Sequence, residues 1–187
     1  DPRAERELHN QLGAVGHEIA IGAITEDTIR ARVAPLLAWG QPPVGTSMLT
    51  MGIDIQGDVE PWVYVWALLA HGNARIHVIE WGRAHGDEAL VTLLNGRLGP
   101  HRIRRALIDG SGNGRRASMR IGARVAACEP AVLIGGDGVM TTFRLGREDE
   151  NDPSTKHWVI HPDLMLDRLY MELLQVAPGA PGGIMFA

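Results

Sequence analysis

Two aspartates stand at the ends of apolar runs that have the composition of buried strands. Asp54 lies in residues 49–58, where apolar side chains alternate with small or polar ones, which is the period of a strand. Asp109 closes residues 102–109, and the three residues before it are apolar. A carboxylate within an apolar run is costly unless it is paired or binds a metal, so Asp54 either caps a turn after the strand or binds a cation. The local pattern leaves both interpretations open.

The hydrophobic pattern also predicts the elements that must position these aspartates. Residues 62–69 and 75–81 alternate and are rich in β-forming side chains, and turn residues precede each run. Together with residues 49–58 they predict an antiparallel meander. The remaining predicted elements are helices at 87–98, 113–128 and 162–174, and strands at 102–109, 131–134, 141–146, 156–160 and 184–186. The predicted order up to residue 134 is therefore β-β-β-α-β-α-β.

The two aspartates would repel each other if their strands were neighbours. In parallel strands Asp54 and Asp109 emerge at one sheet edge, and neither has a basic neighbour in sequence. Their protonation would be coupled unless a divalent cation lies between them, and hard oxygen ligands suit Mg²⁺ or Mn²⁺. Two such ions about 3.5–4 Å apart can hydrolyse a phosphodiester.

The predicted order of strands and helices indicates a fold that suits this chemistry. Acids on the first and fourth strands of a β-β-β-α-β-α-β chain are, by analogy, the layout of the ribonuclease H-like (RuvC-like) nucleases. We therefore expect an α/β fold with a mixed sheet and helices on both faces.

Arginines cluster in sequence around Asp109. Of the 18 basic residues only Lys156 is a lysine, and arginine is suited to bidentate phosphate contacts. The glycine-rich residues 110–114 precede a predicted helix, where backbone can approach a phosphate. An ordinary solvated helix face explains any single arginine equally well. The predicted DNA contacts are Arg104, Arg105, Arg115, Arg116 and Arg120.

Composition sets the remaining bounds. The chain has 187 residues, 45% of them hydrophobic, and a net charge of −4, which neither favours nor excludes a nucleic-acid partner. A single cysteine, Cys128, permits no disulfide within the chain, which fits a reducing compartment. No membrane span or signal peptide is visible. The chain begins Asp1-Pro2 without a methionine, so we expect a fragment of a longer protein.

With these residues in hand, the chain resembles the C-terminal nuclease domain of tailed-phage terminase large subunits, most closely the lambda-type family. That family carries a Leu-Thr-x-Gly-Val-Asp-x-Gln-x-Asp strand, which residues 49–58 match. Its Trp-Asp-Thr-Gly-Gly segment is matched loosely by residues 108–112. Residues 133–136 and 161–166 resemble two later motifs but lack their lysines, and residues 181–187 resemble its Phe-Pro strand. The resemblance spans roughly residues 26–187.

The resemblance implies an activity and its partners. Asp54 and Asp109 would bind Mg²⁺ or Mn²⁺ in a two-ion site, and the enzyme would cut concatemeric viral DNA during packaging, with little sequence specificity. Its expected partners are double-stranded DNA, the portal protein, the small terminase subunit and further copies of itself. It would work in the host cytoplasm at the procapsid portal, away from any membrane.

The family's third acid lies in an Asn-Glu-x-x-Asp segment past the Phe-Pro strand, whereas this sequence stops at Ala187. The third metal ligand would therefore be an acid beyond Ala187 or, within the chain, Asp163 at a predicted helix start. Asp58 matches a family acid and would support the ligands, although a turn role is equally consistent. Glu80 and Asp87 are weaker candidates.

The expected organisation is a lead-in followed by one nuclease domain. Residues 1–46 would lead in from an upstream domain, expected to be the ATPase motor, with a helix beginning after Thr25 whose apolar face includes Val33 and Leu36. Residues 47–187 would form the nuclease domain, truncated at its C-terminal end. No phosphate-binding loop with Gly-Lys-Ser/Thr is present in this sequence.

Two other functions remain open from the sequence. Residues 52–54, Gly-Ile-Asp, also resemble the Gly-Ile-Asp-x-Gly start of the actin-like and sugar-kinase fold, but residues 56–58 here, Gln-Gly-Asp, would place a carboxylate against the ATP phosphate. A non-catalytic module that docks DNA or a portal is favoured by the incomplete set of acids.

Overall fold

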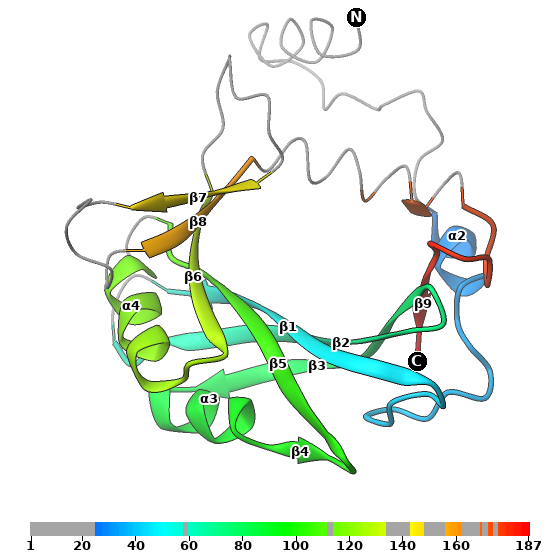
Figure 1. Ribbon diagram of the computed structural model, residues 1–187, viewed down its shortest axis with the longest axis horizontal. Helices are drawn as coiled ribbons and strands as arrows, with labels where there is room; N and C mark the ends of the chain where they lie inside the picture. The colour runs from blue at the N-terminus through cyan, green and yellow to red at the C-terminus, as the bar shows by residue number, and fades with distance from the viewer. Residues whose placement is uncertain are drawn as a thin grey trace, which may run out of the picture.

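The structure is a computed structural model that describes residues 25–57, 60–111, 114–133, 143–147, 156–161, 169, 172–173 and 176–187. Nine strands and three helices are assigned bounds within these residues (Figure 1). They are α2 (Glu26–Arg30), β1 (Thr46–Gln56), β2 (Val63–Gly72), β3 (Arg75–His85), α3 (Asp87–Leu94), β4 (Arg97–Leu98), β5 (His101–Asp109), α4 (Arg115–Arg124), β6 (Cys128–Leu133), β7 (Phe143–Arg147), β8 (Lys156–Ile160) and β9 (Ile184–Phe186).

A single mixed sheet organises the chain. Its strand order is β7-β8-β6-β5-β1-β2-β3-β9, and β4 pairs with β5 off this path. Strands β1, β5, β6 and β8 run parallel to one another, whereas β2 is antiparallel to β1 and β3 is antiparallel to β2. The predicted meander and the predicted order of elements from β1 to β6 are present, with β4 added. The chain is thus α/β with a mixed sheet.

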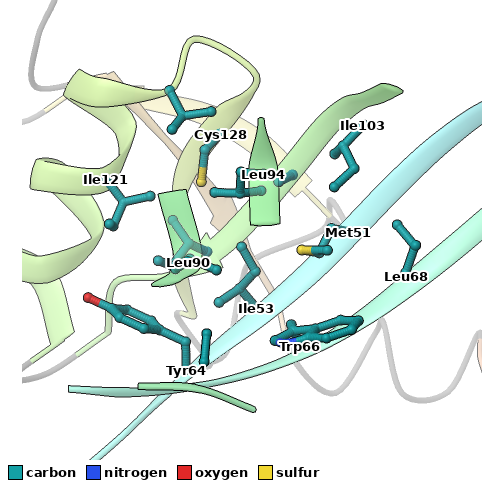
Figure 2. Packing of buried hydrophobic residues seen from close by; sticks show 14 of the residues in the cluster. Met51, Ile53, Tyr64, Trp66, Leu68, Leu90, Leu94, Ile103, Ile121 and Cys128 are labelled. Atoms are coloured by element: carbon teal, nitrogen blue, oxygen red, sulfur yellow. The ribbon is translucent and has the colours of Figure 1, made fainter. Parts of the chain in front are cut away.

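One face of the sheet carries the core, and we call it the helix face. Alternate residues of β1, namely Leu49, Met51 and Ile53, are buried there, and α3 and α4 pack over them through Leu90 and Ile121 (Figure 2). Each alternating strand places its intervening residues on the other side, which we call the opposite face. The two longer helices in the described part of the chain, α3 and α4, thus share one face, so the expected helices on both faces are not confirmed.

Both of these helices are shorter than predicted. Helix α3 ends at Leu94, because Asn95 and Gly96 close it and the next residues form β4. Helix α4 ends at Arg124, and residues from Cys128 belong to β6. The hydrophobic pattern of residues 113–128 combined a helix with the start of a buried strand, which periodicity alone cannot separate. Most of the predicted helix at 162–174 lies outside the described residues.

The helix predicted after Thr25 is also shorter than expected. The predicted apolar face, which included Val33 and Leu36, is wrong. Helix α2 ends at Arg30, and Leu36 is 99% exposed. Pro35 explains the difference, because proline disfavours helical backbone in the residue before it and cannot donate a helix hydrogen bond.

The described part of the lead-in packs against the sheet. The backbone N–H of Ala34 donates to Phe186 in β9, and that of Gly40 donates to Ile79 in β3. The buried Arg32 donates from its guanidinium to the carbonyls of Thr28 and Val176.

One irregularity separates the two halves of β5. The register to β1 shifts between Leu49↔Ile103 and Thr50↔Arg105, so Arg104 is an extra residue in β5. Such a bulge redirects a side chain. The half of β5 before the bulge pairs with β4 and the half after it pairs with β6.

Candidate active site

The two aspartates predicted to bind metal lie side by side. The parallel register pairs Gly52 with Leu107 and Ile53 with Ile108, so the next residues, Asp54 and Asp109, occupy adjacent positions on neighbouring strands. Neighbouring strands are about 4.8 Å apart. The predicted parallel pairing of β1 and β5 is therefore confirmed (Figure 1). It places Asp54 and Asp109 near the carboxyl ends of the two strands.

Both aspartates lie on the opposite face. Ile53 and Ile108 are buried in the core beneath the helices, and the alternation along each strand turns the next side chain away from it. Asp54 is exposed and Asp109 is half-buried. The pair is therefore accessible to a ligand from that side of the described sheet.

Short-range hydrogen bonds orient the carboxylates. The Gln56 amide donates from Nε2 to Oδ2 of Asp54. The backbone N–H of Ser111 donates to Oδ1 of Asp109 at 2.8 Å. Within the described residues no arginine, lysine or histidine forms an ion pair with either carboxylate. Their negative charge is thus oriented but not balanced.

The turn after β5 needs glycine to bring α4 close. A Cβ on Gly110 would lie 2.4 Å from Oγ of Ser118, a fully buried side chain that donates to the carbonyl of Arg115. A Cβ on Gly114 would lie 3.1 Å from Cδ1 of Ile55. These contacts explain the glycines at 110 and 114 through the close packing of α4, which fixes the backbone that carries Asp109.

The donor chemistry of the pair suits a hard divalent cation, because carboxylate oxygens are the ligands that Mg²⁺ and Mn²⁺ prefer. Asp54 and Asp109 would hold it. A group of three or more metal-binding side chains does not occur among the described residues. Asp163 and Asp58, the predicted third ligand and its supporting acid, lie outside the described residues.

The weaker acidic candidates lie elsewhere. Asp87 begins α3, where its carboxylate accepts from the Tyr64 hydroxyl at 2.5 Å and from Nε of Arg120 at 3.1 Å. Glu80 on β3 lies in the row of Leu68 and Met51, on the far side of β2 from the aspartates.

Arg120, a predicted DNA contact, is engaged by carboxylates. Its guanidinium contacts Asp87 and also donates to Glu60. The hydrogen bond that Arg120 donates to Glu60 raises the pKa of Arg120 and lowers the pKa of Glu60. Burial, followed by the hydrogen bond to Asp87, raises the pKa of Tyr64. These groups link the residues before β2 to helices α3 and α4 through ion pairs and hydrogen bonds.

The other predicted arginines are spread over the molecule. Arg105 lies on the opposite face and forms an ion pair of 3.7 Å with Glu129. Arg115 and Arg116 open α4, and Arg116 is exposed. Arg104 is the bulge residue near the far end of β5. Clustering in sequence therefore does not translate into one cluster in space.

Two residues on the same face of the sheet as the aspartates, Gln56 and Arg83, were not predicted from the sequence as site residues. Gln56 orients Asp54, and its position two residues later in the same strand was the available signal. Arg83 of β3 lies in the same row as Asp54, since both pair with Val65, and it is exposed. Arg83 is thus about two strand spacings, or roughly 10 Å, from Asp54. No sequence pattern pointed to it, because the row depends on the register of β2 and β3.

An apolar trough of about 620 Å³ borders the pair on the opposite face. Its lining includes Gly52 and Leu107, which precede the aspartates by two residues on their strands, and Trp158 and Ile160 of β8. Gly52 leaves open space where a side chain would stand.

Comparison of the chain with family models, with curated proteins and with solved structures gave no match. None of the helices in the described ranges has the length and apolarity needed to span a membrane.

Proposed function

We propose that this chain is a metal-dependent DNA endonuclease domain of the ribonuclease H-like class, acting in viral genome packaging as a terminase large subunit does. The observation that carries the proposal is the adjacent placement of Asp54 and Asp109 at the carboxyl ends of two parallel strands, without a balancing cation in the described residues. Two adjacent carboxylates repel each other, and a bound cation would offset this repulsion.

The strand order supports the class of enzyme. Three antiparallel strands lead, through α3, to a strand parallel with the first, which gives the run β3-β2-β1-β5-β6. Ligand sites of α/β sheets lie outside the carboxyl ends of parallel strands. The link to genome packaging rests on the resemblance of residues 49–58 to the terminase motif.

The residues around the pair have distinct tasks in this proposal. Asp54 and Asp109 hold one or two Mg²⁺ or Mn²⁺ ions, which when bound activate water and stabilise the leaving oxygen. Gln56 and the Ser111 N–H keep the carboxylates in their binding orientation. Arg83, in the same row and without an ion pair in the described structure, is placed to contact a phosphate that flanks the cut. Backbone contacts carry no base information, so cutting should show little sequence specificity.

Nicking of supercoiled plasmid in Mn²⁺ tests the proposal. We expect cleavage by the chain, no cleavage in chelator, and a loss of more than about 100-fold in Asp54→Asn and Asp109→Asn, because even outer partners of metal ligands contribute about 10–100-fold. The cleavage activity of Gln56→Leu should therefore lie between that of these variants and that of the wild type. Asp27→Asn, an exposed acid in the first turn of α2, is the matched control and should cut normally.

The same assay addresses a non-catalytic docking module, which is favoured because the described residues supply two acids at the site and not three. If the chain does not cut, it is tested again when extended beyond Ala187 to supply a third acid. Cleavage by the extended chain that depends on Asp54 supports the nuclease. DNA binding without cleavage in both forms, together with no Mn²⁺ binding by titration calorimetry, contradicts it and supports docking.

A further inference from the structure

A second hollow lies at the other end of β5. It has a volume of about 460 Å³ and lies between the β4–β5 hairpin and the start of β1. Its lining is polar and basic, and its charged members are Arg97, Arg102 and Arg104, with His101 beside them. No carboxylate occurs among its described lining residues. We call it the basic hollow.

The three arginines of the basic hollow form no ion pair within the described structure. Several arginines on other surfaces do form ion pairs, as in Arg30–Glu26, Arg124–Glu88 and Arg120–Glu60, whereas Arg83 in the row of Asp54 forms none among the described residues. The basic hollow is therefore a local concentration of positive charge on a chain whose net charge is −4.

The hairpin places two of these charges directly opposite each other. Strand β4 has two residues, and its register pairs Arg97 with Arg102. The turn between them uses Gly99 at φ 60°, a conformation that favours glycine, followed by Pro100. Like charges opposite each other in an antiparallel pair destabilise it. The arrangement therefore works against the hairpin unless an anion occupies the hollow.

The bulge adds the third charge. Arg104 is the extra residue in β5, and a bulge redirects its side chain relative to the regular alternation. Arg104 lines the same hollow as Arg97 and Arg102 as a result. The three guanidinium groups present many donors in planar forks, which match the oxygens of a phosphate.

We propose that the basic hollow binds a backbone phosphate of duplex DNA, away from the aspartate pair. The choice of DNA as the anion rests on the proposed function. At about 3.3 Å per residue, Arg104 and Asp109 are roughly 16 Å apart along β5. That is the rise of about five base pairs at about 3.4 Å each. One duplex laid along the β1–β5 pair reaches both places, so the hollow anchors DNA about half a helical turn from the cut.

Fluorescence anisotropy with a labelled duplex tests this anchor. All measurements use chains carrying Asp54→Asn and no divalent metal, so the result does not depend on cleavage. Arg97→Gln/Arg102→Gln should bind at least about tenfold more weakly at about 0.1 M salt, and the slope of log affinity against log salt should fall by about 1, because one phosphate contact is lost. Arg97→Lys/Arg102→Lys keeps both charges and should restore most of the affinity.

Arg30→Gln/Arg124→Gln is the matched control, since it also removes two positive charges, at exposed ion pairs far from the hollow in sequence. Equal losses in the control and in the hollow variant would mean that net charge alone acts, and the anchor is then rejected. Unchanged binding in the hollow variant rejects it as well. Inorganic pyrophosphate that binds the hollow by titration calorimetry, with DNA affinity insensitive to Arg97 and Arg102, would assign a small free anion instead.

The anchor and the nuclease can fail separately. A hollow variant that loses affinity while the wild type never cuts DNA supports the anchor and argues against the nuclease. Cleavage that depends on Asp54, with DNA binding indifferent to Arg97 and Arg102, supports the nuclease and rejects the anchor.

Discussion

The two ends of the β1–β5 pair carry opposite charges, and both are unbalanced. The carboxyl end holds Asp54 and Asp109 in adjacent positions, and the hairpin end holds Arg97, Arg102 and Arg104 around one hollow. In the described residues neither group has an ion-pair partner. The network of Arg120, Asp87 and Glu60 differs, since its charges are paired. Paired charges join elements to each other, whereas unpaired clusters of one sign are suited to ligands of the other sign.

Gly110→Ala is expected to have the largest effect, because it should disturb the carboxyl end of the β1–β5 pair and leave the hairpin end intact. The new Cβ would lie 2.4 Å from Oγ and 3.2 Å from Cβ of Ser118, which is fully buried, so the turn and α4 must move apart. Overpacking of this kind costs about 1–3 kcal/mol of unfolding free energy. Urea denaturation measures that loss, and plasmid cleavage should fall with it because Asp109 is displaced. Duplex binding through the hairpin end should be retained.

Gly52→Ala is the control for this prediction, because a Cβ there meets nothing within 4 Å. It should leave the urea midpoint nearly unchanged. A Gly110→Ala chain that is as stable and as active as the wild type would show that the close contact with Ser118 does not position the aspartate.

A smaller effect of opposite sign is expected from Arg102→Glu. This change places a carboxylate opposite Arg97 and turns a repulsive cross-strand pair into an attractive one, which stabilises the sheet by about 0.2–1 kcal/mol. DNA affinity should fall at the same time. The urea midpoint and duplex anisotropy measure the two effects, and Arg102→Gln should lie between wild type and Arg102→Glu in stability. A lower midpoint for Arg102→Glu would mean that the repulsion is already relieved in the folded chain.

The smallest effect is a dependence of stability on pH near the hairpin end. His71 lies opposite Met48, which lines the basic hollow, and burial lowers the pKa of His71. Burial, followed by the charge of Arg75, lowers the pKa of His77 as well. The unfolded chain therefore binds more protons just below the ordinary histidine pKa of about 6.5, so the free energy of unfolding decreases as pH falls through that region.

Urea midpoints at neutral and mildly acidic pH measure this dependence, and His71→Gln/His77→Gln should flatten it. The carboxylates Glu60 and Glu88 do not obscure the result. Hydrogen bonds from Arg120 and Arg124 lower their pKa values, so their contribution is lost only at more acidic pH. An equally steep dependence in the double variant would assign the effect to other groups.

The centre of the sheet was open to prediction because its residues alternate. The pattern of Leu49, Met51 and Ile53 predicted β1, and similar alternation predicted β2 and β3, whereas β5 was predicted from the apolar residues before Asp109. The placement of Asp54 beside Asp109 followed once the two strands were taken as parallel neighbours, and the register agrees.

Other features of the fold and the site could not be predicted, because they depend on contacts between residues far apart in the sequence. Strand β4 has only two residues, too few for a period, and it was absorbed into the predicted helix at 87–98. The bulge at Arg104 is a matter of register between strands. Arg120 has partners at Asp87 and Glu60, far away in the chain, so its sequence neighbours suggested DNA where the structure has ion pairs.

The order of the strands also determines how late in folding Asp54 and Asp109 come together. Asp54 and Asp109 are neighbours in space, yet β2, β3 and α3 separate them in the chain. Closing so long a loop costs entropy that is recovered only when the intervening hairpins and helix have formed. A partly folded chain therefore does not hold the two carboxylates in adjacent positions. Under the proposed function, the metal site would form late, and cutting would be delayed until the protein has folded.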